Sequence, residues 1–307
     1  MDGLLKELIE QCRKDTVGGK VANYIPALAK ADPNALGIYI LDRNGLHAQG
    51  GDSKVRFSIQ SVIKPILLLL ALMDNGVDYV RSRVGVESTG KPFDAININE
   101  SVSQEILSEH INPMVNMGAI VMCTLIRGEN YQERFDRLLD LTRKLANNPE
   151  IDVDEEVYLS EKATGNKNRA LAFLMKSCGL LDGDVEEVLD CYFRACSIRV
   201  NCKDLARIAF VLANKGRDFS GTELFPGRYA HYVNAIMMTC GMYDGAGDFA
   251  VTVGVPAKSG VGGGIMAVVP GRMGIGIYSP ALDKKGNSIA GIRILRRLSR
   301  RLELSIF

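Results

Sequence analysis

The order in which strand-like and helix-like segments follow one another constrains the fold of this chain more than any other feature. Two alternating runs, at 37–42 and 46–50, flank Arg43-Asn44-Gly45, and Asn-Gly between apolar runs is a strong signal for a β-hairpin. From 57 to about 215 the apolar residues recur at three- and four-residue spacing, which is typical of helices. After 245, short β-branched and glycine-rich runs return before a basic helical segment ends the chain.

Strands near both ends, with helices between them, favour one antiparallel sheet assembled from the two ends of the chain. We therefore expect an α+β fold in which the first and last helices flank the sheet and an all-helical subdomain is inserted into it. The sheet part comprises about 1–60 and 225–307, the helical part about 61–224, and the 307 residues form one unit with a cleft between its parts. The predicted C-terminal strands fall in FAVTVGV, KSGVGGGIMAVVP and MGIGIYSP.

Charge and hydropathy narrow the classes of partner. The chain carries 37 basic and 36 acidic side chains, and a net charge of +1 argues against binding to nucleic acid or to an anionic membrane surface. The N-terminal segment is an amphipathic helix with charges throughout, which predicts no signal peptide. The longest apolar run, 65–73, is well short of the roughly 20 residues that cross a bilayer. These features favour a small-molecule partner.

Cysteine and histidine positions bear on compartment and cofactor. The seven cysteines are odd in number and lack a framework spacing, which predicts reduced thiols and a cytoplasmic location. The three histidines, His47, His110 and His231, lie far apart, and the chain contains no H-E-x-x-H or C-x-x-C pair. We therefore predict no metal site.

The most informative stretch is FSIQSVIKPI, which places Ser61 and Lys64 in an S-x-x-K arrangement. Three residues apart on a helix, the two side chains share a face, so the amine can reach the serine hydroxyl. Serine becomes a good nucleophile only when a base takes its proton, and burial favours the neutral amine that can do so. The alternative interpretation of this motif is an N-cap serine followed by a surface lysine.

A second motif lies about 200 residues downstream. Lys258-Ser259-Gly260 is similar to the K-T-G triad that accompanies S-x-x-K in serine hydrolases, although Lys258 could instead cap a strand edge. The glycines from 260 to 264 lack the spacing of a phosphate loop, which argues against nucleotide binding. Without bulky side chains, this segment can direct an amide N–H at a reacting carbonyl oxygen, with the Ser61 amide as a second donor.

Six separated blocks of the chain together resemble the serine-dependent glutaminase family. That family shares the fold of the serine β-lactamases and DD-peptidases, and it hydrolyses L-glutamine to L-glutamate and ammonia without a metal or organic cofactor. The resemblance extends from NYIPALA to MGIGIYSP and implies a single catalytic domain. The blocks are FSIQSVIKP, INPMVNMGAI, SEKATGNKNRALAFLMKSCG, LDCYFRACSIRVNC, MMTCGMYDGAG and VPAKSGVGGGIMAVVPG.

The resemblance implies roles for residues at the reacting end of the substrate. Ser61 would be the nucleophile and Lys64 its base. Tyr243 would lie near Ser61 and relay or stabilise the proton, and Tyr192 would line the pocket and help to protonate the departing ammonia. The backbone amides of Ser61 and Val261 would form the oxyanion hole.

The resemblance also implies the residues that bind the amino-acid end of the substrate. Because glutamine is a zwitterion, Glu161 would bind its ammonium, and Asn116, Asn168 and Tyr24 would bind its carboxylate. The residues between Glu161 and Asn168 favour a turn. Taken singly, each asparagine could be a helix N-cap and Glu161 an exposed first-turn carboxylate.

Two other functions stay open at this point. A β-lactam-interacting serine hydrolase of the same fold would use Ser61, Lys64 and Lys258, but the chain has neither the S-D-N triplet nor the export signal of such enzymes. A non-catalytic module could instead bind an amino acid through Asn116, Glu161 and Asn168. The family resemblance further implies a homodimer or homotetramer.

Overall fold

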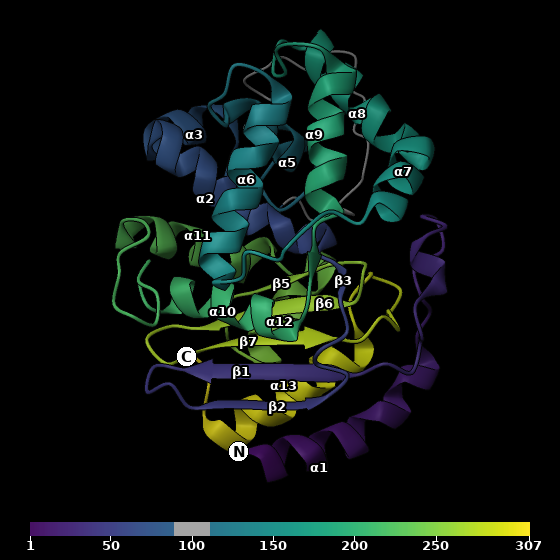
Figure 1. Ribbon diagram of the computed structural model, residues 1–307, viewed down its shortest axis with the longest axis vertical. Helices are drawn as coiled ribbons and strands as arrows, with labels where there is room; N and C mark the ends of the chain where they lie inside the picture. Colours follow the sequence, from purple (N-terminus) through teal and green to yellow (C-terminus); the bar gives the residue numbers. More distant parts are fainter. Residues whose placement is uncertain (89–110) are drawn as a thin grey trace.

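A five-stranded antiparallel sheet joins the two ends of the chain, in the order β2-β1-β7-β6-β5 (Figure 1). The computed structural model describes residues 1–88 and 111–307. The predicted hairpin forms, and Ile40 pairs with Ala48 across it. Its first strand then pairs antiparallel with β7, which makes the sheet continuous. The strands are β1 (Gly37–Asp42), β2 (His47–Gly51), β5 (Ala257–Ser259), β6 (Gly264–Val269) and β7 (Met273–Tyr278).

The first and last helices cover one face of this sheet, as predicted. Helices α1 (Asp2–Arg13) and α13 (Ile289–Leu302) lie side by side below it in Figure 1. Leu5 and Leu298 from these helices belong to one buried cluster with Ile38 and Ile40 of β1. Alternate residues of a strand face opposite sides, so Ile38 and Ile40 direct the same face toward the helices.

Helix α10 (Cys202–Ala213) packs against the other face of the sheet. Two glycines of β7 allow this close approach, because a Cβ atom at Gly274 would lie 2.1 Å from the Ala206 carbonyl oxygen and one at Gly276 would lie 2.0 Å from that of Cys202. The helix forms the layer between the sheet and the rest of the helical part, because it also contacts α6 and α11.

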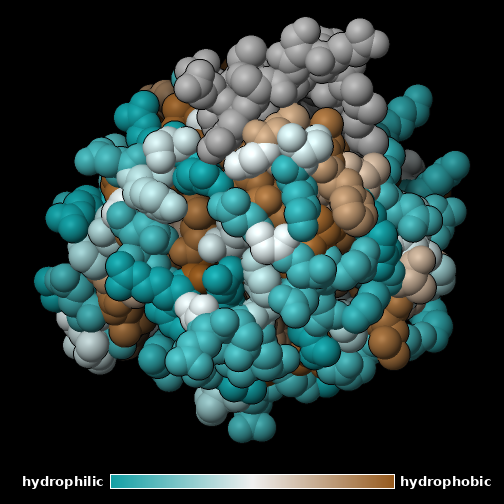
Figure 2. Space-filling model, turned by 90° about the horizontal axis from the view of Figure 1, so that it is seen from above, coloured by the Kyte–Doolittle hydropathy of each residue, from teal (hydrophilic) through white to brown (hydrophobic). Residues whose placement is uncertain are grey.

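The remaining helices form the upper part of the molecule in Figure 1. At their centre, every residue of α2 from Lys64 to Leu72 is buried, as expected for the longest apolar run. In the described ranges, no helix is both long and apolar enough to cross a membrane. From above, the outer surface is largely hydrophilic, with apolar side chains visible in small groups (Figure 2). The helices are α2 (Lys64–Asn75), α3 (Val77–Arg83), α5 (Asn116–Leu125), α6 (Tyr131–Ala146), α7 (Glu155–Thr164), α8 (Asn166–Ser177), α9 (Val185–Cys196) and α11 (Gly227–Cys240).

One predicted strand is wrong. Most of FAVTVGV lies in the short helix α12 (Ala246–Thr252). Phe249 and Val253, four residues apart, are buried in the cluster beneath the sheet, whereas Val251 is exposed. A short apolar run is compatible with both the strand and the helix periodicity. In this protein the helical spacing is the one that buries both side chains.

A small second sheet was not anticipated from the sequence. It consists of β3 (Phe57–Ser58) paired antiparallel with β4 (Arg199–Val200). All seven cysteines are free thiols, in agreement with their predicted state. His110 lies outside the described residues. Within the described ranges, no group of three or more His, Cys, Asp or Glu residues could hold a metal ion.

Candidate active site

The S-x-x-K motif lies at the junction between the small sheet and the buried central helix. Ser61 belongs to the 3-10 turn η3 (Gln60–Ile63), and Lys64 is the first residue of α2. The Ile59 amide donates to the Ile198 carbonyl over 2.7 Å, which fixes the chain just before the turn. Ser61 is 7% exposed and Lys64 is 0% exposed, so the surface-lysine interpretation of the motif is excluded.

The amine of Lys64 is held by the start of α5. Its Nζ donates to Asn116 Oδ1 over 2.7 Å and to the Met114 carbonyl over 3.2 Å. Asn116 Nδ2 in turn donates to Asn168 Oδ1 over 2.9 Å, and the Tyr192 hydroxyl donates to Asn116 Oδ1 over 3.3 Å. One asparagine thus joins three residues predicted for the site. Neither asparagine is an N-cap, because Val115 caps α5 and Gly165 caps α8.

Glu161 faces the inside of the molecule from α7. It is 6% exposed, and its Oε1 accepts a 2.7 Å hydrogen bond from Gln60 Nε2. Burial raises the pKa of Glu161 to about 7, although the Gln60 hydrogen bond and the positive charge of Lys64 oppose this rise. An exposed first-turn carboxylate is therefore excluded. The predicted turn before Asn168 is present, since α7 ends at Thr164 and α8 begins at Asn166.

Tyr243 and Lys258 form the wall of the site that belongs to the sheet part. Tyr243 begins the 3-10 turn η4 (Tyr243–Gly245) with φ +51° and is 9% exposed. Burial raises the pKa of its hydroxyl, and the neighbouring Ser61 side chain partly offsets this rise. Lys258 Nζ lies 4.3 Å from the Tyr243 ring centroid and donates to the carbonyls of Gly241 and Ser259.

Complete burial also sets the electrostatics of Lys258. Desolvation, followed by the nearby positive charge of Lys64, lowers the pKa of Lys258 well below its usual value. A lysine that only capped a strand edge would keep its amine in water. Instead the amine lies against the ring of Tyr243, the residue whose hydroxyl pKa is lowered by Ser61.

The glycine turn after β5 packs directly against the segment that carries Ser61. A Cβ atom at Gly262 would lie 2.6 Å from the Ser58 carbonyl oxygen, and one at Gly260 would lie 2.9 Å from that of Ile59. The turn is closed by the Gly260 amide donating to Gly264 and the Gly263 amide donating to Gly260. These closing bonds leave Val261 within the turn, between Gly260 and Gly262, next to the segment that carries Ser61.

Two cavities meet at Val261. One, of about 530 Å³, is lined by Tyr24, Tyr243, Val261 and Gly286 among others. The other, of about 370 Å³, is lined by Ser58, Val261 and Gly262 among others. Tyr24 is 55% exposed and lines the first cavity together with Tyr243 and Val261.

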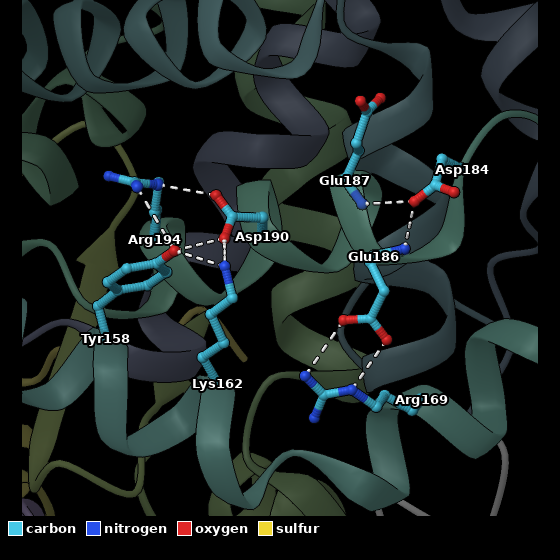
Figure 3. Close-up of polar contacts among 8 residues, drawn as sticks. All are labelled: Tyr158, Lys162, Arg169, Asp184, Glu186, Glu187, Asp190 and Arg194. Atoms are coloured by element: carbon cyan, nitrogen blue, oxygen red, sulfur yellow. Dashed lines mark hydrogen bonds and ion pairs between the residues drawn. The ribbon is translucent and has the colours of Figure 1, made fainter.

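A polar cluster on α9 fastens α7 to the rest of the helical part (Figure 3). Asp190 accepts hydrogen bonds from Lys162 Nζ over 2.5 Å, from Arg194 Nε over 2.9 Å and from the Tyr158 hydroxyl. Lys162 follows Glu161 directly on α7. This cluster therefore braces the helix that carries the buried carboxylate.

A second ion pair fastens α8 to the same helix. Arg169, next to Asn168, donates to Glu186 from Nε over 2.9 Å and from Nη2 over 3.2 Å (Figure 3). Asp184 caps the N-terminus of α9 by accepting from the amides of Glu186 and Glu187. Helix α9 also carries Tyr192. It therefore holds the two helices, α7 and α8, that carry Glu161 and Asn168.

Three contributors to the site were missed from the sequence. Gln60 hydrogen-bonds Glu161, the Met114 carbonyl accepts from Lys64, and Cys196 contributes to the raised pKa of Tyr192. Gln60 carries the only usable signal, because it is a polar residue next to Ser61 in an otherwise apolar stretch. A backbone carbonyl carries no sequence signal at all. Burial raises the pKa of Tyr192 well above its usual value, so its hydroxyl stays protonated.

Comparison with known proteins places these features in one family. The family model for glutaminase matches residues 19–307. A glutaminase of Clostridium botulinum strain Loch Maree is 53% identical over 310 residues, and one of Clostridium tetani is 52% identical over 310 residues, each alignment covering 100% of both chains.

Solved structures agree with this family assignment. A covalent complex of the Bacillus subtilis glutaminase with 5-oxo-L-norleucine matches with a TM-score of 0.90 and 37% identity over 100% of this chain and 99% of that chain. A Bacillus glutaminase structure matches with a TM-score of 0.90 and 36% identity over 99% and 98% of the two chains. The α+β fold with its antiparallel sheet is thus that of these glutaminases, and the chain belongs to the glutaminase family.

Proposed function

We propose that this protein hydrolyses L-glutamine to L-glutamate and ammonia through a Ser61 acyl-enzyme. We also propose that the 307 residues form a single catalytic domain. The observation that carries the proposal is the position of Lys64. It is fully buried at the start of α2, and its amine is held by Asn116, which also contacts Tyr192 and Asn168. A buried amine three residues from a serine is suited to accept the serine proton.

In the first step, Lys64 Nζ accepts the proton of Ser61 Oγ while Oγ forms a bond to the side-chain amide carbon of glutamine. The oxygen of the tetrahedral intermediate accepts hydrogen bonds from the amides of Ser61 and Val261. The carbon–nitrogen bond then breaks, and the departing nitrogen receives a proton from Lys64, relayed by Tyr243 or Tyr192. The closeness of Tyr243 to Ser61, whose side chain lowers the pKa of the Tyr243 hydroxyl, supports the relay.

In the second step, water attacks the glutamyl ester. Its proton passes to Lys64, the bond between the acyl carbon and Ser61 Oγ breaks, and Lys64 returns the proton to Oγ. Glutamate then leaves, and both Ser61 and the neutral Lys64 are restored. No metal or organic cofactor enters either step. Glu161 binds the substrate ammonium, and Asn116, Asn168 and Tyr24 bind its carboxylate. Supporting this division, Glu161 is the acidic group beside the network that links Lys64, Asn116 and Asn168.

Two further properties complete the proposal. We infer a cytoplasmic location, which is supported by the seven free thiols. We also infer a homodimer or homotetramer. Measuring the molar mass in solution by light scattering would distinguish either from a monomer.

The decisive experiment measures ammonia and glutamate production from glutamine by wild type and by Ser61→Ala. We expect Ser61→Ala to lower turnover by on the order of 10³-fold or more, because the covalent route is lost. Ser82→Ala, which changes an exposed serine, serves as the control. Near-normal hydrolysis by Ser61→Ala would contradict the mechanism.

The same assay tests the alternatives. Asparagine, one methylene shorter, should be a poor substrate, although one methylene is usually worth only about 1–3 kcal/mol. Stoichiometric acylation of Ser61 by a labelled penicillin, without glutamine turnover, would favour a β-lactam-interacting enzyme. Tight glutamine binding without ammonia release would favour a binding module.

A further inference from the structure

Gln60 links the segment that carries the nucleophile to the buried carboxylate. Its side chain is 3% exposed, and its Nε2 donates to Glu161 Oε1 over 2.7 Å and to Ser58 Oγ over 3.3 Å. The amide therefore connects β3 and η3 with α7, two segments about 100 residues apart in sequence. A primary amide has two N–H donors, so both contacts can be made at once.

The backbone of Gln60 is also unusual. Its φ is +50°, in the left-handed region that non-glycine residues rarely adopt. Its side-chain stem lies against the glycine turn, because Cβ atoms built at Gly260 and Gly262 would come within 3.4 Å of its Cβ and 3.2 Å of its Cγ. Such backbone conformations persist where the surrounding contacts hold them, and they cluster at functional sites. One side chain thus touches the nucleophile segment, the Val261 turn and Glu161.

The surroundings of Glu161 show why this contact matters. In its protonated form, Lys64 on α2 acts on it as a positive charge, and Tyr192 and Cys196 interact with it from α9. Burial raises the pKa of both α9 groups well above their usual values, so they remain neutral there. Burial by itself favours the protonated carboxyl, whereas a donated hydrogen bond favours the carboxylate. Gln60 supplies that hydrogen bond directly.

We propose that Gln60 is a positioning residue that keeps Glu161 ionised and aimed at the substrate ammonium, and that it thereby sets the lower pH limit of glutamine binding. The inference rests on the proposed role of Glu161 in binding that ammonium. Gln60 itself performs no chemical step. It acts by holding the carboxylate in its charged form at a fixed distance from the Ser61 segment.

The test compares pH profiles of kcat/KM for glutamine, from about pH 5.5 to 9, in wild type and Gln60→Met. Methionine has a similar length and no N–H donor. We expect the acid limb to move to higher pH by about one unit, which is roughly a tenfold loss at pH 6 and little loss at pH 9. The change should appear in KM, with kcat altered by less than about threefold.

Two more variants keep the test decisive. Ser58→Ala removes the other partner of the Gln60 amide but leaves the bond to Glu161, so its acid limb should match wild type. Gln60→Gly also lacks the amide and suits φ +50°, so it should show the same shift as Gln60→Met even if methionine at this position prevents folding. Circular dichroism spectra of each variant, compared with that of wild type, test whether the variant is folded.

The outcomes separate this inference from the proposed function. An unchanged acid limb in both Gln60 variants, or an equal loss at every pH, would overturn the role of Gln60. Normal KM in Glu161→Gln would instead remove the proposed ammonium-binding role of Glu161. A Glu161→Gln variant with a strongly raised KM, together with wild-type profiles for Gln60→Met and Gln60→Gly, would reject only the inference about Gln60.

Discussion

The two walls of the site are held in place by different kinds of contact. The wall from the sheet part depends on backbone geometry: the glycine turn packs on the carbonyls of Ser58 and Ile59, and Lys258 donates to two further carbonyls. The wall from the helical part depends on bonds between side chains, such as those of Asn116, and on ion pairs at its outer surface.

This difference separates two classes of effect. Backbone contacts between close-packed segments have little room to adjust, so a change on the sheet side should disrupt the chemical step. Side-chain contacts are individually weaker and respond to pH and salt. A change on the helical side should therefore alter substrate binding in a graded way. Three substitutions test this contrast.

The largest effect is expected for Gly262→Ala in the sheet wall. The new Cβ would lie 2.6 Å from the Ser58 carbonyl oxygen, so the turn must move and displace the Val261 amide. Loss of one oxyanion donor typically lowers kcat by about 10²–10³-fold, and we expect a decrease of that order from steady-state kinetics.

The matched control for this change is Gly247→Ala. Nothing lies within 4 Å of a Cβ built at Gly247, which is in helix α12, so activity and melting temperature should be retained. If Gly262→Ala keeps wild-type kcat, the close packing of this wall is not what aligns the oxyanion donor.

An intermediate effect is expected for Glu161→Gln in the helical wall. Removing the carboxylate that we propose binds the ammonium should raise KM by on the order of 10²-fold and change kcat much less. Because the pKa of Glu161 is about 7, the carboxylate fraction falls as pH drops below that value. In wild type, protonation of Glu161 should lower kcat/KM as the pH drops. This decrease should be absent from the pH profile of the variant. Equal losses in kcat and in kcat/KM would show that Glu161 acts in the chemical step instead.

The same substitution should affect stability with a defined sign. Burial raises the pKa of Glu161 from 4.5 to about 7, so between these values the folded state binds more protons than the unfolded state. This group favours folding at low pH, and its contribution is lost as pH rises, by about 3 kcal/mol in total. In thermal melts, the melting temperature of Glu161→Gln minus that of wild type should be larger at pH 8 than at pH 5. The opposite trend would indicate that Glu161 is ionised throughout this range.

The smallest effect is expected for Asp190→Asn, which weakens the brace behind Glu161. The side chains of Lys162 and Asp190 are 46% and 27% exposed, and such pairs are worth about 0–1 kcal/mol. We expect KM to rise a few-fold with kcat unchanged, and 1 M NaCl to bring wild type toward the variant.

Glu223→Gln is the control for the brace, because it removes an ion pair with Arg217 at a distance in sequence from every predicted site residue. A KM equal to that of wild type in Asp190→Asn would show that the packing of α7 alone positions Glu161.

How far the sequence predicts the fold depends on the range of the interactions involved. The hairpin around Asn44-Gly45 was predictable because turn chemistry and alternation act within a few residues. The run FAVTVGV was assigned wrongly because its period is ambiguous, and burial of Phe249 and Val253 selected the helix. The pairing of β3 with β4 joins segments about 140 residues apart and left no local signal.

The candidate site divides in the same way. Ser61, Lys64 and Lys258 were found because the motifs that contain them are short and contiguous. Gln60 was missed because its role depends on a hydrogen bond to Glu161, about 100 residues later, and on a φ that no pattern specifies. The carbonyl of Met114 was missed because every residue has one.

By itself, the sequence determined the hairpin, most of the helices and the buried central helix, and it indicated candidate motifs for a nucleophile and a base, because periodicity, turn chemistry and spacing are local. Only the tertiary structure decided how those groups behave. It places Lys64 within hydrogen-bonding distance of Asn116, and it buries Glu161, which raises the pKa of this carboxyl to about 7. Protonation and alignment depend on burial and on neighbours far away in the chain, and these exist only after the two ends have formed one sheet beneath the helices.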